Sequence, residues 1–248
     1  MLGPIFRFLE ASRAWSMYRV HASAEATRQP MITTASSPVL AHFRGNRFLQ
    51  SLVAGFGVVW IWAAIDPVYR FDWFLENILT IVAVPSLVMH HRRFPISELS
   101  WSLIFAFMCL HTIGSHYTYS EVPVGFWLQD EFDLTRNHYD RFVHFCFGLL
   151  LAYPFQEVGL RHGGRTAWFA TLAALGFVFA GSASFEIIEM CVALVVDPAA
   201  GQAYLGTQGD EWDGQKDMAL AAVGALITLS LMLTVERRGI ARGARSGG

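Results

Sequence analysis

Six apolar stretches, each close to the length needed to cross a bilayer, dominate this sequence of 248 residues. A membrane-spanning helix needs about 20 predominantly apolar residues. Only 15% of the residues are charged, against about 25% in soluble domains. Because every backbone polar group inside lipid must be paired within its own segment, these stretches should be helices. The sequence therefore predicts an all-α, polytopic membrane helix bundle with about six transmembrane helices, at 48–65, 73–90, 97–114, 139–158, 167–195 and 217–235.

Basic residues are concentrated in alternate connections between these stretches. The sequences HHRR at 90–93, RHGGR at 161–165 and ERRGIARGAR at 236–245 are basic, and so is the N-terminal segment, whereas the intervening loops are acidic. Cytoplasmic loops carry an excess of Lys and Arg, so we expect both termini to be cytoplasmic. The predicted divisions are a cytoplasmic basic N-terminal segment (1–46), a six-helix transmembrane domain (47–236) and a basic cytoplasmic tail (237–248).

Ionisable side chains gather at the span ends that this orientation places outside the cell. Three pairs lie about one helical turn apart: Asp140 with His144, Glu186 with Glu189, and Asp213 with Asp217. Residues three or four apart share a helix face. A charged side chain at the bilayer centre costs roughly 2.5–3.5 kcal/mol on insertion scales, and less near the interface. We therefore expect the three pairs to meet and to be compensated by ion pairing with Arg141 or Lys216, by a bound cation, or by water in a cavity.

Carboxylates and imidazoles are the ligands that divalent metal ions prefer in proteins. A bound metal of unspecified identity would also explain why the acidic sequence GTQGDEWDGQKDM at 206–218 directly precedes a span. The predicted metal ligands are Asp140, His144, Glu186, Glu189, Asp213 and Asp217. The predicted catalytic residues are Asp140, His144, Glu186 and Asp217, and the predicted substrate-binding residues are His116, Tyr117, Arg141, Gln208 and Lys216.

Several of these polar residues also have a structural interpretation. A single histidine in a span, such as His111, often packs or forms hydrogen bonds instead of binding a ligand. Arg141 can form a structural ion pair with Asp140. Glu186 and Glu189 are harder to explain in this way, because two like charges one turn apart in an apolar helix repel each other without a partner.

Four longer motifs resemble the YjdF-like family of uncharacterised bacterial inner-membrane proteins. They are HTIGSHYTYSEVP at 111–123, RNHYDRFVHF at 136–145, SASFEIIEM at 182–190 and YLGTQGDEWDGQKDM at 204–218. The resemblance covers roughly residues 50–235; Phe71 and Lys216 depart from the family pattern. It implies a multi-pass protein of the bacterial inner (plasma) membrane and supplies no activity. A shorter likeness is to VanZ-like membrane proteins. It rests on three helices, which match at Asp140, Arg141, His144 and Phe145, at either Glu186 or Glu189, and at Asp217 and Gly224.

Three classes of function fit these features. The first is a metal-dependent, membrane-embedded hydrolase or transferase that acts at the outer leaflet on a lipid-linked or phosphate-containing substrate. The second is a proton or cation transporter, which the apolar inner halves of several spans disfavour, because a conduit needs polar groups along its length. The third is a non-catalytic structural or assembly protein. We expect membrane lipids and a lipid-linked substrate as partners and no nucleic acid, and the sequence leaves the oligomeric state open.

Overall fold

The computed structural model describes residues 46–91, 95–162 and 166–246, and all regular secondary structure in them is helical. These residues belong to one compact unit, Val39–Gly248. The predicted N-terminal segment, apart from Asn46, lies outside the described residues. So do parts of two predicted cytoplasmic loops, 92–94 and 163–165.

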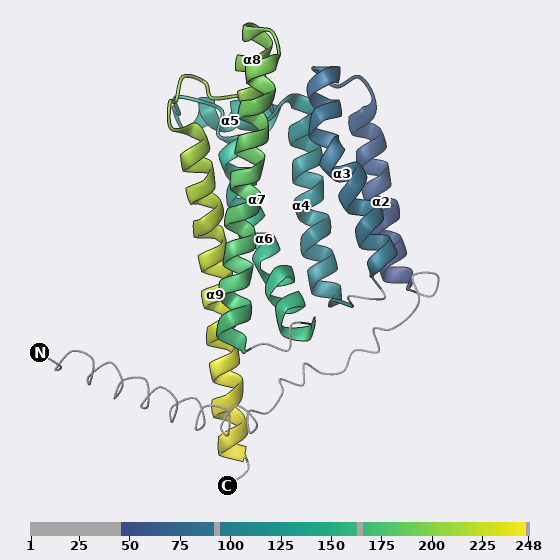
Figure 1. Cartoon of the computed structure of the whole chain (residues 1–248), viewed down its shortest axis with the longest axis vertical. Helices are drawn as coiled ribbons and strands as arrows, with labels where there is room; N and C mark the ends of the chain where they lie inside the picture. Colours follow the sequence, from purple (N-terminus) through teal and green to yellow (C-terminus); the bar gives the residue numbers. More distant parts are fainter. Residues whose placement is uncertain (1–45, 92–94, 163–165, 247–248) are drawn as a thin grey trace, which may run out of the picture. The chain divides into compact units, whose positions relative to one another are not determined.

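Long helices account for all six predicted spans, with boundaries within a few residues of the prediction except at the end of the last helix. They run side by side with alternating direction (Figure 1). They are α2 (Arg47–Ala64), α3 (Arg70–His90), α4 (Glu98–Tyr117), α6 (Tyr139–His162), α7 (Ala167–Val195) and α9 (Asp213–Ser246). The last helix continues beyond the predicted span into the basic tail.

Five of the described helices are long and apolar enough to cross a membrane, namely α2, α3, α6, α7 and α9. Large apolar side chains on their outer faces are exposed, such as Val58, Phe177 and Leu194. Such a surface suits lipid rather than water. The 20-residue helix α4 is outside this set because it carries several polar residues, and these are buried against its neighbours: Ser100, His111, Thr112, Ser115 and His116. The structure is therefore an all-helical membrane bundle.

The contact between α6 and α9 depends on small residues. A Cβ atom on Gly224 would collide with the backbone of α6 at Phe145 and Leu149, and a Cβ atom on Gly148 would collide with the backbone of α9. The Thr228 hydroxyl donates a hydrogen bond to the Leu149 carbonyl at 2.6 Å. Small residues let membrane helices approach closely, so the first two turns of α6 and α9, which carry six of the predicted site residues, are held near each other.

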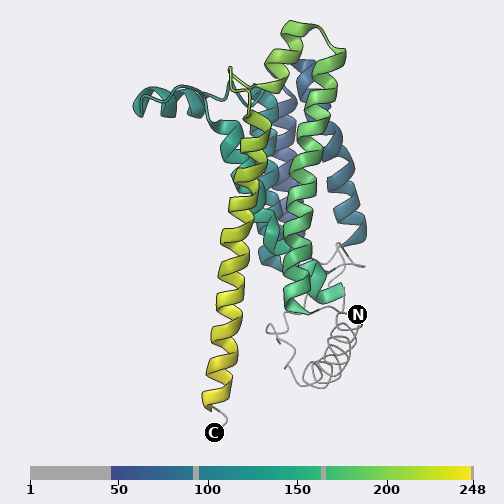
Figure 2. The ribbon, with the colours of Figure 1, turned by 60° about the vertical axis from the view of Figure 1, so that its left-hand side comes forward.

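Two short helices, α5 (Pro123–Glu131) and α8 (Pro198–Leu205), occupy loops at the end of the bundle where α6 and α9 begin (Figure 1). Helix α5 projects sideways from the bundle (Figure 2). The side chains of Phe126, Trp127 and Phe132, on and just after α5, are exposed. Aromatic side chains are common at the boundary between membrane and water, which fits α5 lying along that boundary.

Candidate functional site

The three predicted pairs converge at one end of the bundle. Helices α6 and α9 begin there and α7 ends there (Figure 1). Asp140, His144, Glu189, Asp213 and Asp217 are buried, and Asp217 is only 1% exposed. Side chains that are more than seventy residues apart in the sequence therefore share one polar cluster.

Three aspartates form the centre of this cluster. Asp140, Asp213 and Asp217 each offer a carboxylate oxygen, and these oxygens lie within 4.8 Å of one another. Within the described residues, the Oδ1 atoms of Asp140 and Asp217 have no hydrogen-bond partner. A buried carboxylate without a donor or a counter-charge is costly. The three aspartates therefore provide an oxygen-rich position that suits a cation.

His144 joins the aspartates to α7. Its Nε2 atom lies 3.2 Å from Glu186 Oε1 and 3.7 Å from Asp140 Oδ1, and its Nδ1 atom lies 3.2 Å from Ser182 Oγ. These contacts on both ring nitrogens fix the orientation of the imidazole. Glu186 also lies against the start of α9, where a Cβ atom on Gly214 would come within 2.5 Å of Glu186 Oε2. Glycine at this position lets the glutamate approach the aspartates.

Two further buried glutamates extend the cluster toward α3. Glu189 on α7 is close enough to Asp140, Glu76 and Glu186 for their charges to interact. Glu76 on α3 was not among the predicted site residues, although it lies in the first turns of a span. The Tyr204 hydroxyl on α8 interacts with Glu76, and burial, together with these two glutamates, raises the pKa of Tyr204. Tyr204 therefore keeps its proton and remains a donor beside the carboxylates.

Arg136 is the main residue of the cluster that is absent from the predicted site residues, although it opens the motif at 136–145. It is buried, just before α6. Its Nη1 atom donates to Asp213 Oδ1 at 2.5 Å and to the Thr207 carbonyl at 2.9 Å. Its Nη2 atom donates to Asp213 Oδ2 at 3.1 Å and to the Gly206 carbonyl at 3.2 Å. A bidentate contact between arginine and carboxylate is strong and directional. Arg136 therefore links the start of α6 to the start of α9.

Two other cations neutralise the outermost part of the acidic stretch. Arg141 donates to Asp213 at 2.8 Å and also to Asp210, and Lys216 Nζ donates to Asp210 at 2.5 Å. Hydrogen bonds from Lys216, from the Trp212 backbone and from Arg141 lower the pKa of Asp210. This is the ion pairing with Arg141 and Lys216 that the sequence names as one source of charge compensation. Ion pairs already account for Asp210 and Asp213.

Gln208, a predicted substrate-binding residue, holds the loop before α9 in place. Its side-chain oxygen accepts the Asn137 backbone N–H at 3.0 Å, and its Nε2 atom donates to the Asn137 carbonyl at 2.9 Å. Gln208 has a left-handed backbone with φ of 50°, which is uncommon for a residue other than glycine. Its side chain is thus already engaged in joining the loop to the start of α6.

His116 and Tyr117, also predicted to bind substrate, have partners on α2 instead. His116 Nδ1 donates to the Ala63 carbonyl at 2.9 Å, and its ring stacks on Trp62 with centroids 4.8 Å apart. The Tyr117 ring contacts the same histidine edge-on at 4.5 Å. These contacts join the ends of α4 and α2, and the structure does not bring either residue into the carboxylate cluster.

His111 has the structural role that the sequence left open. The Tyr119 hydroxyl donates to His111 Nδ1 at 2.5 Å, and His111 Nε2 donates to the backbone carbonyl of Glu76 at 3.2 Å. Burial raises the pKa of Tyr119 well above its usual value, so the hydroxyl keeps the proton that it donates. Both ring nitrogens of His111 are therefore used within the protein.

Comparison with known proteins assigns the family. The model of a family described as "Predicted membrane protein (DUF2238)" matches residues 48–238, which is more than half of the chain. The chain belongs to this family. It is also similar to the inner membrane protein YjdF of Escherichia coli K12, with 35% identity over 190 residues, covering 75% of this chain and 88% of that protein. No solved structure matches.

The similarity to YjdF confirms the predicted resemblance to YjdF-like proteins. Its relative in E. coli is an inner-membrane protein, and five described helices of this chain are long and apolar enough to cross a bilayer. This DUF2238 protein is therefore a multi-pass protein of the bacterial inner membrane. The matched region, 48–238, contains the whole carboxylate cluster.

Proposed function

We propose that this DUF2238 protein is a membrane-embedded, metal-dependent hydrolase or transferase that acts on a phosphate-containing lipid at the outer end of the bundle. The observation that carries the proposal is the pair Asp140 and Asp217. Both are buried, both offer oxygens within 4.8 Å of each other and of Asp213, and both have an Oδ1 atom without a hydrogen-bond partner.

The balance of charge supports a cation at this position. Arg136 and Arg141 bind Asp213, and Lys216 binds Asp210. Among the described residues, none of these three cations forms an ion pair with Asp140 or Asp217. A divalent ion would compensate the two aspartates. Oxygen ligands favour Mg²⁺, Ca²⁺ or Mn²⁺, and the nearby imidazole of His144 also admits Zn²⁺ or iron.

Such an ion would support chemistry at a phosphate ester. It would polarise a phosphoryl oxygen and lower the pKa of a nearby water. His144, which Glu186 and Ser182 orient, would accept the proton of the water that attacks the phosphorus. It would then return that proton to the ester oxygen that leaves. In a transferase, an alcohol takes the place of the attacking water.

The test is the metal content of protein purified in detergent, after supply of Mg²⁺, Mn²⁺ and Zn²⁺ in turn. We expect about one ion per chain, and at least about a tenfold loss of affinity in Asp140→Asn and Asp217→Asn, because even the loss of a group that orients a metal ligand typically costs that much. Glu157→Gln is the matched control. Glu157 is also buried, but it accepts hydrogen bonds from the Ser97 backbone and side chain near the opposite end of α6.

This control should weaken the fold and leave the metal content unchanged. The metal proposal is wrong if the wild-type protein binds none of the three ions, or if both aspartate variants bind them as well as wild type does. If the aspartate variants instead lowered only thermal stability, and the cell tolerated them at matched protein levels, a structural role would be favoured.

We also propose six spans with both termini in the cytoplasm, which makes α4 the sixth span. Helix α4 has 20 residues and packs against α2 and α6, which are both candidate spans. Its polar residues are buried in the bundle rather than exposed to lipid, as polar groups in membrane helices usually are. The basic connections on one side support the same orientation.

A transporter is the less favoured alternative. A path for protons or cations needs polar groups along its whole length. The space that leads inward from His144 is lined mainly by apolar side chains, including Phe147, Leu151 and Phe155. That lining suits a hydrocarbon chain better than an ion.

A further inference from the structure

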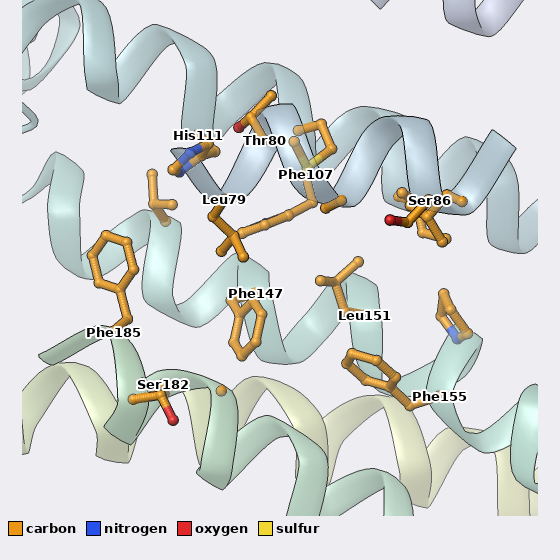
Figure 3. Close-up of a pocket in the computed structure, with 18 of the residues that line it drawn as sticks. Leu79, Thr80, Ser86, Phe107, His111, Phe147, Leu151, Phe155, Ser182 and Phe185 are labelled. Carbon is orange, nitrogen blue, oxygen red and sulfur yellow. The ribbon is translucent and has the colours of Figure 1, made fainter. Parts of the chain in front are cut away.

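An apolar cavity of about 710 Å³ lies between α3, α4, α6 and α7. Side chains of several helices face this common space, among them Leu79, Phe147 and Phe185 (Figure 3). Ligand pockets in proteins usually measure about 300–1,000 Å³. The cavity is therefore large enough for a ligand, and its lining selects for an apolar one.

The cavity is long as well as apolar. On α6 its lining extends from Val143 and His144 to Val158. At a rise of 1.5 Å per residue, the distance from His144 to Val158 is about 21 Å. The hydrocarbon core of a bilayer is about 30 Å thick, so a single leaflet accounts for roughly half of that. A long hydrocarbon chain that starts near His144 would fit inside.

One end of the cavity reaches the carboxylate cluster. His144 and Ser182 line the cavity, and the same histidine contacts Glu186 and Asp140 through its Nε2 atom. A molecule that placed a polar group beside Asp140 would thus have the apolar space directly next to it. The two regions form one site with a polar end and an apolar end.

The cavity also communicates with the lipid around the bundle. Leu79 on α3 is 62% exposed and Ile188 on α7 is 57% exposed, although both line the cavity. Deeper lining residues, such as Trp101 at 8%, are nearly inaccessible. Because this is an integral membrane protein, the exposed rim between α3 and α7 faces acyl chains. A lipid chain can therefore enter from the side without leaving the bilayer.

We infer that this cavity binds one long hydrocarbon chain of an outer-leaflet lipid, whose phosphate-bearing head lies at Asp140 and His144. The position of the head rests on the proposed function, whereas the position of the chain rests on the cavity alone. The hydrocarbon chain of this lipid can be acyl or polyprenyl, since both are apolar, as the lining of the cavity is.

The test is photo-crosslinking in nanodiscs that contain the full-length protein. One probe is phosphatidic acid with a diazirine at the end of an acyl chain, and the other is a polyprenyl phosphate with a diazirine at the end of its chain. Mass spectrometry then locates the labelled residues. We expect labels deep in the cavity, on Trp101 or Leu151. The probe that labels these residues identifies the kind of chain.

Variants that fill the cavity make the test sharper. Ala83→Phe and Leu87→Trp, both in cavity-lining positions on α3, should each reduce deep labelling at least fivefold. Ala180→Phe is the matched control, since Ala180 is exposed on α7 and does not line the cavity. It should leave deep labelling unchanged. Labels confined to outward-facing residues such as Phe177, or deep labelling that neither cavity variant reduces, would overturn the inference.

A third probe tests whether the phosphate head contributes to binding independently of the hydrocarbon chain. Diacylglycerol with the same diazirine lacks the phosphate, and we expect it to label the deep residues at least fivefold less than phosphatidic acid does. Equal labelling would refute the position of the head and leave the chain site intact. Deep labelling in protein that binds no metal would likewise support the cavity and count against the proposed enzyme, so the two proposals fail separately.

Discussion

Replacing Arg136 with alanine should destabilise this protein more than any change to an exposed ion pair at the same end of the bundle. Arg136 is 5% exposed and its guanidinium donates four hydrogen bonds. Two go to Asp213, and the other two go to the carbonyls of Gly206 and Thr207. The variant would leave a buried carboxylate and two carbonyl groups with fewer donors.

Breaking a buried ion pair by removing one partner usually costs about 3–5 kcal/mol. Arg141 remains 2.8 Å from Asp213 and compensates part of the lost charge. We therefore expect Arg136→Ala to lower the free energy of unfolding by an amount near the lower limit, about 3 kcal/mol. A double-mutant cycle with Asp213→Ala isolates the pair. Its coupling energy should be at least about 1.5 kcal/mol, as for other close charge pairs.

The free energy of unfolding can be measured by titrating the detergent-solubilised protein with sodium dodecyl sulfate. Arg70→Ala is the control, because Arg70 contacts Asp66 at 3.8 Å and both side chains are more than 80% exposed. Exposed pairs contribute about 0–1 kcal/mol. If Arg136→Ala and Arg70→Ala differ by less than about 0.5 kcal/mol, within the usual range for surface substitutions, the buried ion pair does not stabilise the fold as described.

Two further predictions concern packing and orientation. Gly224→Ala should cost about 1–3 kcal/mol in the same titration, because the new methyl group would meet the α6 backbone and overpacking has that cost. A Cβ atom on Gly176 would have no heavy atom within 4 Å, so Gly176→Ala should stabilise α7 by up to about 1 kcal/mol. If the two glycine variants changed the free energy of unfolding equally, the close contact between α6 and α9 would be refuted. A green fluorescent protein fused after Gly248 should fluoresce in cells, and alkaline phosphatase fused there should be inactive, whereas the reverse pattern would place the C-terminus outside.

The long helices could be predicted from the sequence because lipid imposes a length and a composition on each span. Helix α7 begins and ends at the predicted residues, 167 and 195. The short helices α5 and α8 were not predicted, since nine and eight residues in a loop give too few turns for a clear periodic pattern. Helix α4 was predicted as a helix, but its buried polar residues make it less apolar than the other five long helices.

The site was predictable where spacing along one helix decides which side chains meet. Asp140 and His144, four residues apart, do lie on one face and contact each other. Contacts between distant segments could not be derived in this way. Arg136 meets Asp213 across 77 residues, and Gln208 meets Asn137 across 71. Both depend on the left-handed backbone at 206 and 208, whose path no local pattern specifies. The one available signal was the motif RNHYDRFVHF at 136–145, which Arg136 opens.

The close approach of α6 and α9 at Gly148 and Gly224 bears on how bilayer thickness affects the protein. Helices adapt to a thinner or thicker bilayer by tilting, and two helices in backbone contact must tilt as a single rigid body. Asp140 and Asp217, carried by this pair, would keep their separation in membranes of different composition. Glu76 stands on α3, which is outside that pair, so this contact does not fix its distance from the two aspartates.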